Sequence, residues 1–220
     1  MTDREADEAL ARAEAFGIDL SLLRESLKLT PTERLRRHEQ AVALVQALKN
    51  PGEVKLDLLP ALIPALCESG VKFVLIGGLA AAVHGATYAT RDLDVCYSRH
   101  LDNLEKLARA LAPFSPRLRD AMPELPFALD FATLRAGCNF TLTTTAGDLD
   151  LFGELPGLGD YTRVIEYAES RKMVGFVCHV LSLEGLILAK KAAGRPKDQA
   201  QVTELEALLA LRKKQPPQEP

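Results

Sequence analysis

Residues 73–94 read FVLIGGLAAAVHGATYATRDLD, and this stretch decides the fold. An apolar, strand-prone run at 73–76 ends in Gly77-Gly78, and an alanine-rich, helix-prone segment follows. Asp92 and Asp94 then stand two residues apart, with apolar residues at 93 and 95. The pattern predicts a strand, a helix and a second strand over 72–77, 78–86 and 92–97.

The two aspartates form a candidate metal site. In a strand, residues i and i+2 leave the same face, with Cα atoms about 6.6 Å apart at ~3.3 Å per residue. Two carboxylates this close repel each other unless a cation lies between them. Mg²⁺ is the usual cation for one or two carboxylates plus substrate phosphates. The glycine pair lets the backbone approach a ligand closely, and the helix behind it directs free N–H groups at an anion.

These motifs resemble a known group of enzymes. Gly77-Gly78, the helix that follows, and Thr90-Arg91-Asp92-Leu93-Asp94 are similar to the signature of the polymerase-β-like nucleotidyltransferase superfamily. The closest likeness is to the AbiEii-type toxin nucleotidyltransferases, whose His-Gly pair and threonine are matched by His84-Gly85 and Thr90. Many members have an arginine where Tyr88 stands, which weakens the case for an arginine contact in this loop and leaves the carboxylate pair unaffected. The resemblance covers roughly residues 53–213.

The resemblance implies an α+β (α/β) fold, with a small mixed-sheet nucleotidyltransferase core flanked by N-terminal and C-terminal helices. The expected organisation is a helical segment over 1–50, the core over 53–160, a mostly helical part over 161–213 and a disordered tail over 214–220. Asn50-Pro51-Gly52 is the expected boundary after the first segment. Further elements are expected as a helix over 57–69, a helix over 101–111, strands over 127–134, 139–145 and 149–152, a helix near 161–168, strands over 171–175 and 176–181, and two helices separated at 194–196.

The implied activity is Mg²⁺-dependent transfer of a nucleotide from an NTP to an acceptor hydroxyl. Two Mg²⁺ ions would be held by Asp92 and Asp94 and by a third carboxylate on a later strand. Asp150, between Leu149 and Leu151, is the preferred third ligand and would also take the acceptor's proton. Two rivals stay open: Asp148, which follows a turn glycine, and Asp130, which has apolar flanks.

Four residues are expected to bind the donor nucleotide. Gly77 and Gly78 would let the backbone close on its phosphates, and Thr90 would either order the carboxylate strand or touch a phosphate. Lys190 continues an apolar helical face, ahead of a Gly-Arg-Pro-Lys-Asp segment at 194–198 that the resemblance places near the nucleotide. Its neighbour Lys191 points about 100° away. Lys190 is therefore expected on the triphosphate; the alternative is that it only reaches out to water.

The remaining polar candidates have simpler interpretations. The positions 34–38, RLRRH, favour a solvated helix face over an RNA contact, and His84 favours a packed or capping role. Asp198 is expected to cap the last helix. The scattered cysteines show no metal-ligand spacing and predict buried, reduced thiols; they are Cys67, Cys96, Cys138 and Cys178.

Composition and charge bear on the location of the protein and on the kinds of partner that it can bind. The chain has 220 residues, 47% of them hydrophobic, and a net charge of −3, so no global basic field predicts nucleic-acid binding. No N-terminal signal region and no apolar run of ~20 residues is present, so a cytoplasmic protein without membrane contact is expected. The toxin-like relatives suggest a tRNA acceptor and an antitoxin partner, although small molecules and protein hydroxyls stay open as acceptors. The alternative function is a catalytically silent nucleotide-binding or protein-interaction module.

Overall fold

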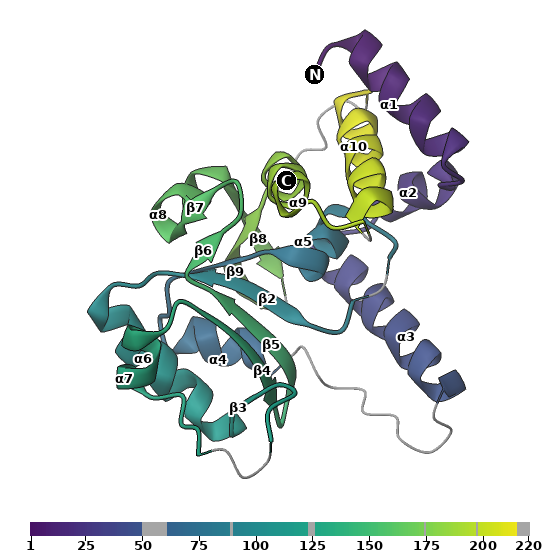
Figure 1. The fold of residues 1–220 in the computed structure, drawn as a ribbon. Coiled ribbons are helices and arrows are strands. Elements are labelled where there is room, and N and C mark those ends of the chain that lie inside the picture. Colours follow the sequence, from purple (N-terminus) through teal and green to yellow (C-terminus); the bar gives the residue numbers. More distant parts are fainter. Residues whose placement is uncertain (50–60, 89, 123–125, 174, 197, 215–220) are drawn as a thin grey trace.

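A computed structural model gives the fold of the chain (Figure 1). It describes residues 1–49, 61–88, 90–122, 126–173, 175–196 and 198–214. The predicted boundary at 50–52, the first residues of the predicted helix over 57–69, and almost all of the predicted tail lie outside the described residues. The part of that helix that is described is α4 (Leu62–Glu68).

The centre of the molecule is a mixed sheet. Seven strands of the described chain follow the spatial order β3-β4-β5-β2-β1-β9-β8. Their bounds are β1 (Phe73–Leu75), β2 (Leu93–Tyr97), β3 (Arg117–Leu118), β4 (Asn139–Thr144), β5 (Gly147–Phe152), β8 (Ala168–Met173) and β9 (Phe176–Leu181). A separate pair, β6 (Glu154–Leu155) and β7 (Gly159–Asp160), lies beside the sheet. The predicted mixed α/β fold class is confirmed.

Strand directions bring the two acidic segments together. β1 is antiparallel to β2 and parallel to β9, while β4 and β5 form an antiparallel hairpin. β2 and β5 are parallel neighbours, with Leu93 opposite Leu149 and Asp94 opposite Asp150. Because side chains alternate along a strand, the leucines of both strands enter the core and the aspartates share the other face.

One helix is enclosed by the rest of the molecule. α5 (Gly77–His84) follows β1 directly, and seven of its eight residues are buried. A helix that is apolar on every side has to be covered on every side. Neighbours from distant parts of the chain contact it, namely β2, α3 (Pro31–Lys49) and α9 (Leu183–Ala193). The Gly-Gly end of α5 is therefore held in one place by the whole fold.

The other helices lie in groups around the sheet (Figure 1). α6 (Leu101–Leu111) and α7 (Phe131–Ala136) gather near the β3–β4–β5 side, and α4 packs against α6 and β9. α8 (Tyr161–Val164) follows β7 and packs near β1 and β2. α9 and α10 (Asp198–Lys214) stand on the opposite side, and the chain breaks between them at 194–196 as predicted.

The first helix is joined to the last. α1 (Asp3–Ala15) runs along α10, burying Ala6, Ala9 and Ala13, and α2 (Leu20–Leu27) also touches α10. Small residues permit the close approach, and ion pairs Lys213–Asp3 (2.9 Å) and Arg12–Glu206 (3.2 Å) flank it. No helix in the described part of the chain has the length and apolar character needed to cross a membrane.

One predicted strand is wrong. Residues 127–134 do not form a strand: the segment ends in α7, which begins after Asp130. The side chain of Asp130 accepts the backbone N–H of Thr133 at 2.8 Å and caps the helix. The strand prediction rested on apolar flanks, and it missed that an aspartate is a favoured N-cap residue for a helix that begins after it. The Pro-rich stretch before it contains the short edge strand β3.

Candidate functional site

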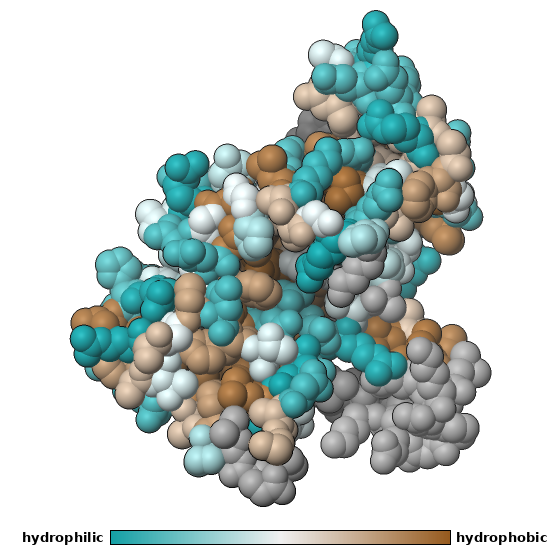
Figure 2. Space-filling view, viewed as in Figure 1, coloured by the Kyte–Doolittle hydropathy of each residue, from teal (hydrophilic) through white to brown (hydrophobic). Residues whose placement is uncertain are grey.

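The carboxylates meet on one face of the sheet. Asp94 and Asp150 are direct neighbours across the parallel β2–β5 pair, and Asp150 in turn faces Thr141 on β4. Asp92 lies one residue before β2, at the same end of the sheet. Figure 2 shows hydrophilic residues gathered around the starts of β2 and β5. The structure thus brings the three predicted carboxylates together.

The rival carboxylates are placed differently. Asp130 caps α7 and does not line the cavity described below. Asp148 accepts the hydroxyl hydrogen of Thr143 at 2.9 Å across the hairpin, and also does not line the cavity. Asp148 nevertheless shares a face of β5 with Asp150 and lies 3.6 Å from Nε of Arg119, so only Asp130 lies apart from the other carboxylates.

The glycine pair makes room for side chains of the site itself. Gly77 has φ +65°, and a Cβ there would lie 2.0 Å from Oδ2 of Asp94. At Gly78 a Cβ would lie 2.6 Å from the Cβ of Thr90. The backbone N–H of Gly78 also donates to the Asp94 carboxylate. The two glycines therefore let the start of α5 approach the carboxylate strand, in addition to lining the cavity.

Thr90 is positioned by the N-terminal part of the chain. His38, on α3, lies with Nε2 2.9 Å from the carbonyl oxygen of Thr90 and 3.4 Å from its backbone nitrogen. Burial lowers the pKa of His38, which keeps the ring neutral near pH 7. The loop before Asp92 is therefore tied to a helix more than fifty residues earlier in the chain, a link that no sequence pattern indicated.

Burial and neighbouring charge change the titration of Asp94. Its pKa is raised to about 7, first by burial and then by the negative charges of Asp150 and Asp92, against which the Gly78 N–H and Lys190 act. Burial also raises the pKa of Asp150, and the guanidinium of Arg119 opposes that rise. A carboxylate that is hard to ionise alone gains most from a nearby cation.

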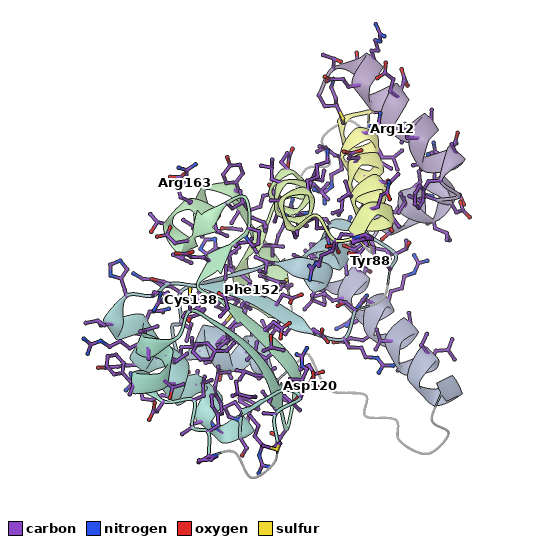
Figure 3. The ribbon with its side chains drawn as sticks, in the orientation of Figure 1. Arg12, Tyr88, Asp120, Cys138, Phe152 and Arg163 are labelled. Atoms are coloured by element: carbon purple, nitrogen blue, oxygen red, sulfur yellow. The ribbon has the colours of Figure 1, made fainter. Side chains whose placement is uncertain are left out.

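Arg119 is the residue that sequence reasoning missed. Its Nη2 donates to Oδ1 of Asp150 at 3.0 Å and to the carbonyl oxygen of Leu142 at 3.1 Å. Its Nη1 lies 3.5 Å from Asp92 and its Nε 3.6 Å from Asp148. It comes from the residue after β3, and its neighbour Asp120 is labelled beside the start of β5 in Figure 3. In the sequence it stands two residues after Arg117 in a Pro-rich stretch, and only strand pairing brings it here.

A cavity of about 560 Å³ opens beside the carboxylates. One wall is apolar and is formed by residues of β5, β6 and α9, including Phe152, Leu155 and Leu186. In Figure 3 Phe152 is labelled near the middle of the sheet and Tyr88 near the first turn of α10, and both line the cavity. Gly77, Gly78, Thr90, Asp92, Asp94, Arg119, Asp150 and Lys190 line it as well. The volume is in the range of small-molecule sites.

The two lysines of α9 have separate surroundings. Lys190 is 12% exposed, and its Nζ lies 3.4 Å from Asp198, hydrogen-bonds Gln201 and stands 5.8 Å from the centre of the Tyr88 ring. Burial lowers its pKa, against the pull of Asp198. Lys191 is 56% exposed and pairs with Glu206 at 2.7 Å, outside the cavity. The predicted difference in direction is confirmed.

Tyr88 and Asp198 complete this end of the cavity. The hydroxyl of Tyr88 is buried and has no hydrogen-bond partner among the described residues, and burial raises its pKa. Asp198 accepts from Arg195 Nε at 2.8 Å and from Lys190, and its pKa is lowered by these cations despite burial. Asp198 thus begins α10 and also neutralises two cations of the cavity wall.

The structure corrects the expectation for part of the 34–38 cluster. Arg34 is not solvated: it donates to the carbonyl oxygens of Ser26, Leu27 and Val83 at 2.7–3.0 Å and so joins the ends of α2 and α5. His38 is buried, whereas Arg36 and Arg37 are exposed as expected. The polar pattern of the segment did not show that its neighbours would be helix ends with free carbonyls.

His84 is a packed residue, as predicted. It is fully buried, with Nε2 2.8 Å from the carbonyl oxygen of Leu181 and Nδ1 2.9 Å from Nη2 of Arg212. Since Arg212 can only donate, Nδ1 is the acceptor and Nε2 carries the hydrogen. Burial, and next the charge of Arg212, lower its pKa to about 3, so the ring stays neutral.

The cysteines are free thiols in the structure, in agreement with the prediction of reduced cysteines. Cys96 and Cys178 are buried, whereas Cys67 and Cys138 are only partly buried, which corrects the expectation that all four are enclosed. Cys67 and Cys178 lie with their sulfur atoms 3.5 Å apart.

The donor set suits Mg²⁺ when a nucleotide supplies further ligands. Asp92 and Asp94 offer hard carboxylate oxygens beside a cavity, and Mg²⁺ commonly takes one or two carboxylates plus phosphate oxygens. As the side chains lie, no three acidic, histidine or cysteine residues of the described chain form a complete metal cage. Arg119 stands among the carboxylates and supplies the positive charge there.

Comparisons with known proteins give distant likenesses. No family model and no curated protein matches the sequence. A provisionally assigned nucleotidyltransferase from Thermotoga maritima is similar in structure, with 18% identity and a TM-score of 0.45 over 67% of this chain and 89% of that one. The antibiotic-resistance factor ANT(2'')-Ia is similar with 14% identity and a TM-score of 0.44 over 71% of this chain and 82% of that one. Likenesses at this level do not assign an activity to the chain.

Proposed function

We propose that this protein is a Mg²⁺-dependent nucleotidyltransferase, which transfers a nucleotidyl group from an NTP to an acceptor hydroxyl. The observation that carries the proposal is the register of β2 and β5. It sets Asp150 beside Asp94, with Asp92 at the same end, at a cavity that the Gly-Gly end of α5 also lines. The motif resemblance described above supports the same activity.

The chain's own residues would bind the donor as follows. The backbone N–H groups at the start of α5 and the ammonium of Lys190 would hold the triphosphate, since both line the cavity and both favour anions. The apolar wall of β5 and α9 leaves room for the nucleoside. Thr90 stands beside Gly78, where it can order the carboxylate strand and reach a phosphate.

Asp92, Asp94 and Asp150 would hold two Mg²⁺ ions, which supply charge neutralisation of the phosphates and activate the acceptor hydroxyl. The acceptor oxygen forms a bond to the α-phosphorus of the NTP, and the bond from that phosphorus to the pyrophosphate breaks. Asp150 takes the hydroxyl proton.

The acceptor follows from the motif resemblance alone. We propose an RNA, with tRNA first, because toxin-like nucleotidyltransferases suggest it, and an antitoxin protein as partner for the same reason. A cytoplasmic location belongs to this proposal too. Each labelled NTP incubated with total RNA, then with protein extract and small hydroxyl compounds, tests the acceptor class.

Five substitutions in one assay test the site. Asp92→Asn, Asp94→Asn and Asp150→Asn should each lower transfer by at least 10²-fold, since loss of electrostatic stabilisation at a reacting centre has about this size. Asp130→Asn and Asp148→Asn are the matched controls and should retain most activity. Near-normal transfer by Asp92→Asn or Asp94→Asn would exclude the two-metal mechanism. An inactive Asp148→Asn beside an active Asp150→Asn would reverse the choice of third carboxylate.

A second candidate is a silent nucleotide-binding module. The ion pairs of Arg119 with Asp92 and Asp150 favour it, because they occupy the carboxylates that a metal needs. Nucleotide binding without turnover, measured with every NTP and with the RNA, small-molecule and protein acceptors above, is the result that would support this second candidate over the first.

A further inference from the structure

One cross-strand row of side chains ends in a cation. Asp94 on β2 is opposite Asp150 on β5, Asp150 is opposite Thr141 on β4, and the backbone N–H of Arg119 donates to the carbonyl oxygen of Thr141 at 2.9 Å. Residues in register on adjacent strands point to the same side of a sheet. The chain thus carries its own positive charge in line with its carboxylates.

The guanidinium contacts several carboxylates of this face at once. It hydrogen-bonds Asp150 and forms looser ion pairs with Asp92 and Asp148, while Asp94 lies next to Asp150. Its side chain is 19% exposed, and its Nε is buried without a hydrogen-bond partner in the described chain. One guanidinium therefore faces several negative charges and is incompletely bonded itself.

Resting on the function proposed above, we propose that Arg119 is the resident counter-ion of the site and competes with the divalent cation for Asp92 and Asp150. Binding of the cation requires Arg119 to leave these carboxylates. Arg119 would therefore set how tightly, and at what cation concentration, the site is loaded.

Competition follows from distance. A Mg²⁺ ion binds oxygen at about 2.0–2.1 Å. The Oδ1 atom of Asp150 already has the Arg119 Nη2 at 3.0 Å, so a cation on the same oxygen would stand within a few ångströms of a like charge. At that separation repulsion between charges is strong even near a protein surface. Two cations on this one oxygen repel each other, which favours movement of one of them.

Arg119 is attached where movement is easy. It follows β3, a strand of only two residues at the edge of the sheet. The next residue, Asp120, has φ +59°, a left-handed conformation that ends the strand. A short edge strand has pairing on one side only, so the arginine can turn outward without disturbing the centre of the sheet.

The test compares Arg119→Gln with Arg117→Gln. Arg117 lies on the edge strand itself, its exposed side chain has no ion pair or hydrogen bond in the described structure, and its replacement makes the same charge change. Mn²⁺ binding is titrated by electron paramagnetic resonance without nucleotide, with Mg²⁺ as competitor. Arg119→Gln should bind Mn²⁺ roughly tenfold more tightly than wild type, and Arg117→Gln within about twofold, because only Arg119 is next to the ligands.

Thermal unfolding gives a second readout, because loss of the Arg119 charge should affect the Tm of the metal-free protein and the Tm gain on adding Mg²⁺ in opposite directions. Without metal, Arg119→Gln should melt below wild type, since its carboxylates repel one another uncompensated. With Mg²⁺ it should gain more in Tm than wild type does. Arg119→Lys keeps the positive charge and therefore the repulsion, so it should bind Mn²⁺ within about threefold of wild type. In wild type itself, nuclear magnetic resonance should show the Arg119 Nε–H losing its protection from exchange when Mg²⁺ is added, which tests the proposal even where a variant fails to fold.

Equal or weaker Mn²⁺ binding by Arg119→Gln, or an Nε–H unchanged by Mg²⁺, would overturn the proposal. If wild type still transfers nucleotides in that case, only the competition is wrong. If neither wild type nor any variant binds Mn²⁺ or an NTP, the competition and the proposed function are both wrong.

Discussion

Asp94 is the residue whose chemistry depends most on its surroundings. In an unfolded chain an aspartate titrates near pH 3.9, whereas in the folded protein burial and the charges of Asp150 and Asp92 raise its pKa to about 7. Between these two pH values the folded state keeps a proton that the unfolded state has lost. Asp94 therefore adds stability at low pH and loses that contribution as pH rises towards 7.

We expect the substitution Asp94→Asn to reveal this pH-dependent contribution to stability. Asparagine does not titrate, so the Tm of the variant minus that of wild type should increase from about pH 4 to about pH 7 and then stay level. The measurement is thermal unfolding across this range in the presence of EDTA. Asp130→Asn is the control, because the pKa of Asp130 is lowered by its helix-capping bonds. A Tm difference independent of pH would contradict the raised pKa.

Among the elements, α5 shows why the glycine pair is needed. Helix propensity favours alanine over glycine by up to about 1 kcal/mol. At Gly78, however, a Cβ would meet Thr90 at 2.6 Å. Crowding in a packed interior costs roughly 1–3 kcal/mol, so it outweighs propensity.

Gly78→Ala should therefore lower the free energy of unfolding by roughly 1–3 kcal/mol. Urea denaturation measures the change. The double variant Gly78→Ala with Thr90→Gly removes the clash, and its loss should be smaller than the sum of the two single losses. A single variant as stable as wild type would show that α5 has room to shift away from the carboxylate strand.

α9 presents two lysines to different surroundings. Lys190 lines the cavity between Asp198 and Gln201, while Lys191 pairs with Glu206 at the surface. We expect Lys190→Ala to weaken NTP binding by roughly tenfold or more, because hydrogen bonds to a charged group contribute about 1.5–3 kcal/mol. Lys191→Ala should stay close to wild type, as exposed ion pairs contribute little. Titration of both variants with NTP measures the two affinities. An equal loss of affinity in both variants would mean that the triphosphate does not bind at Lys190.

At the scale of the whole molecule, the site is positioned by segments from both ends of the chain. α3 places His38 on Thr90, and α10 places Glu204 on Thr87, whose backbone and hydroxyl both donate to it at 2.6 and 2.9 Å. Arg34 joins α2, α3 and α5 through backbone carbonyls. The loop between α5 and β2 is thus held by both helical ends.

Arg34→Ala should destabilise the protein by roughly 2–4 kcal/mol, because it leaves carbonyl groups at two helix ends without their charged donor. Arg37→Ala, an exposed change on the same helix, should stay within about 0.5 kcal/mol of wild type. Chemical denaturation of both variants tests this. Similar small effects would mean that water replaces the guanidinium without loss.

The sequence alone determined the local pattern at the centre of this protein. Alternation of leucine and aspartate sets the inward and outward faces of β2 and β5, and the glycine pair marks the start of α5; both depend only on neighbouring residues. Helix limits such as those of α6 followed for the same reason. Where the local signals competed, as at Asp130, sequence reasoning failed.

Only the tertiary structure decided which distant residues share the site. The register that sets Asp94 beside Asp150 depends on pairing between strands over fifty residues apart. Arg119 reaches them from the position after an edge strand of two residues, which is too short to carry a periodic signal. The partners of Arg34, His38 and Tyr88 likewise come from distant segments. Periodicity shows the direction in which a side chain points. What it meets there depends on how the whole chain packs.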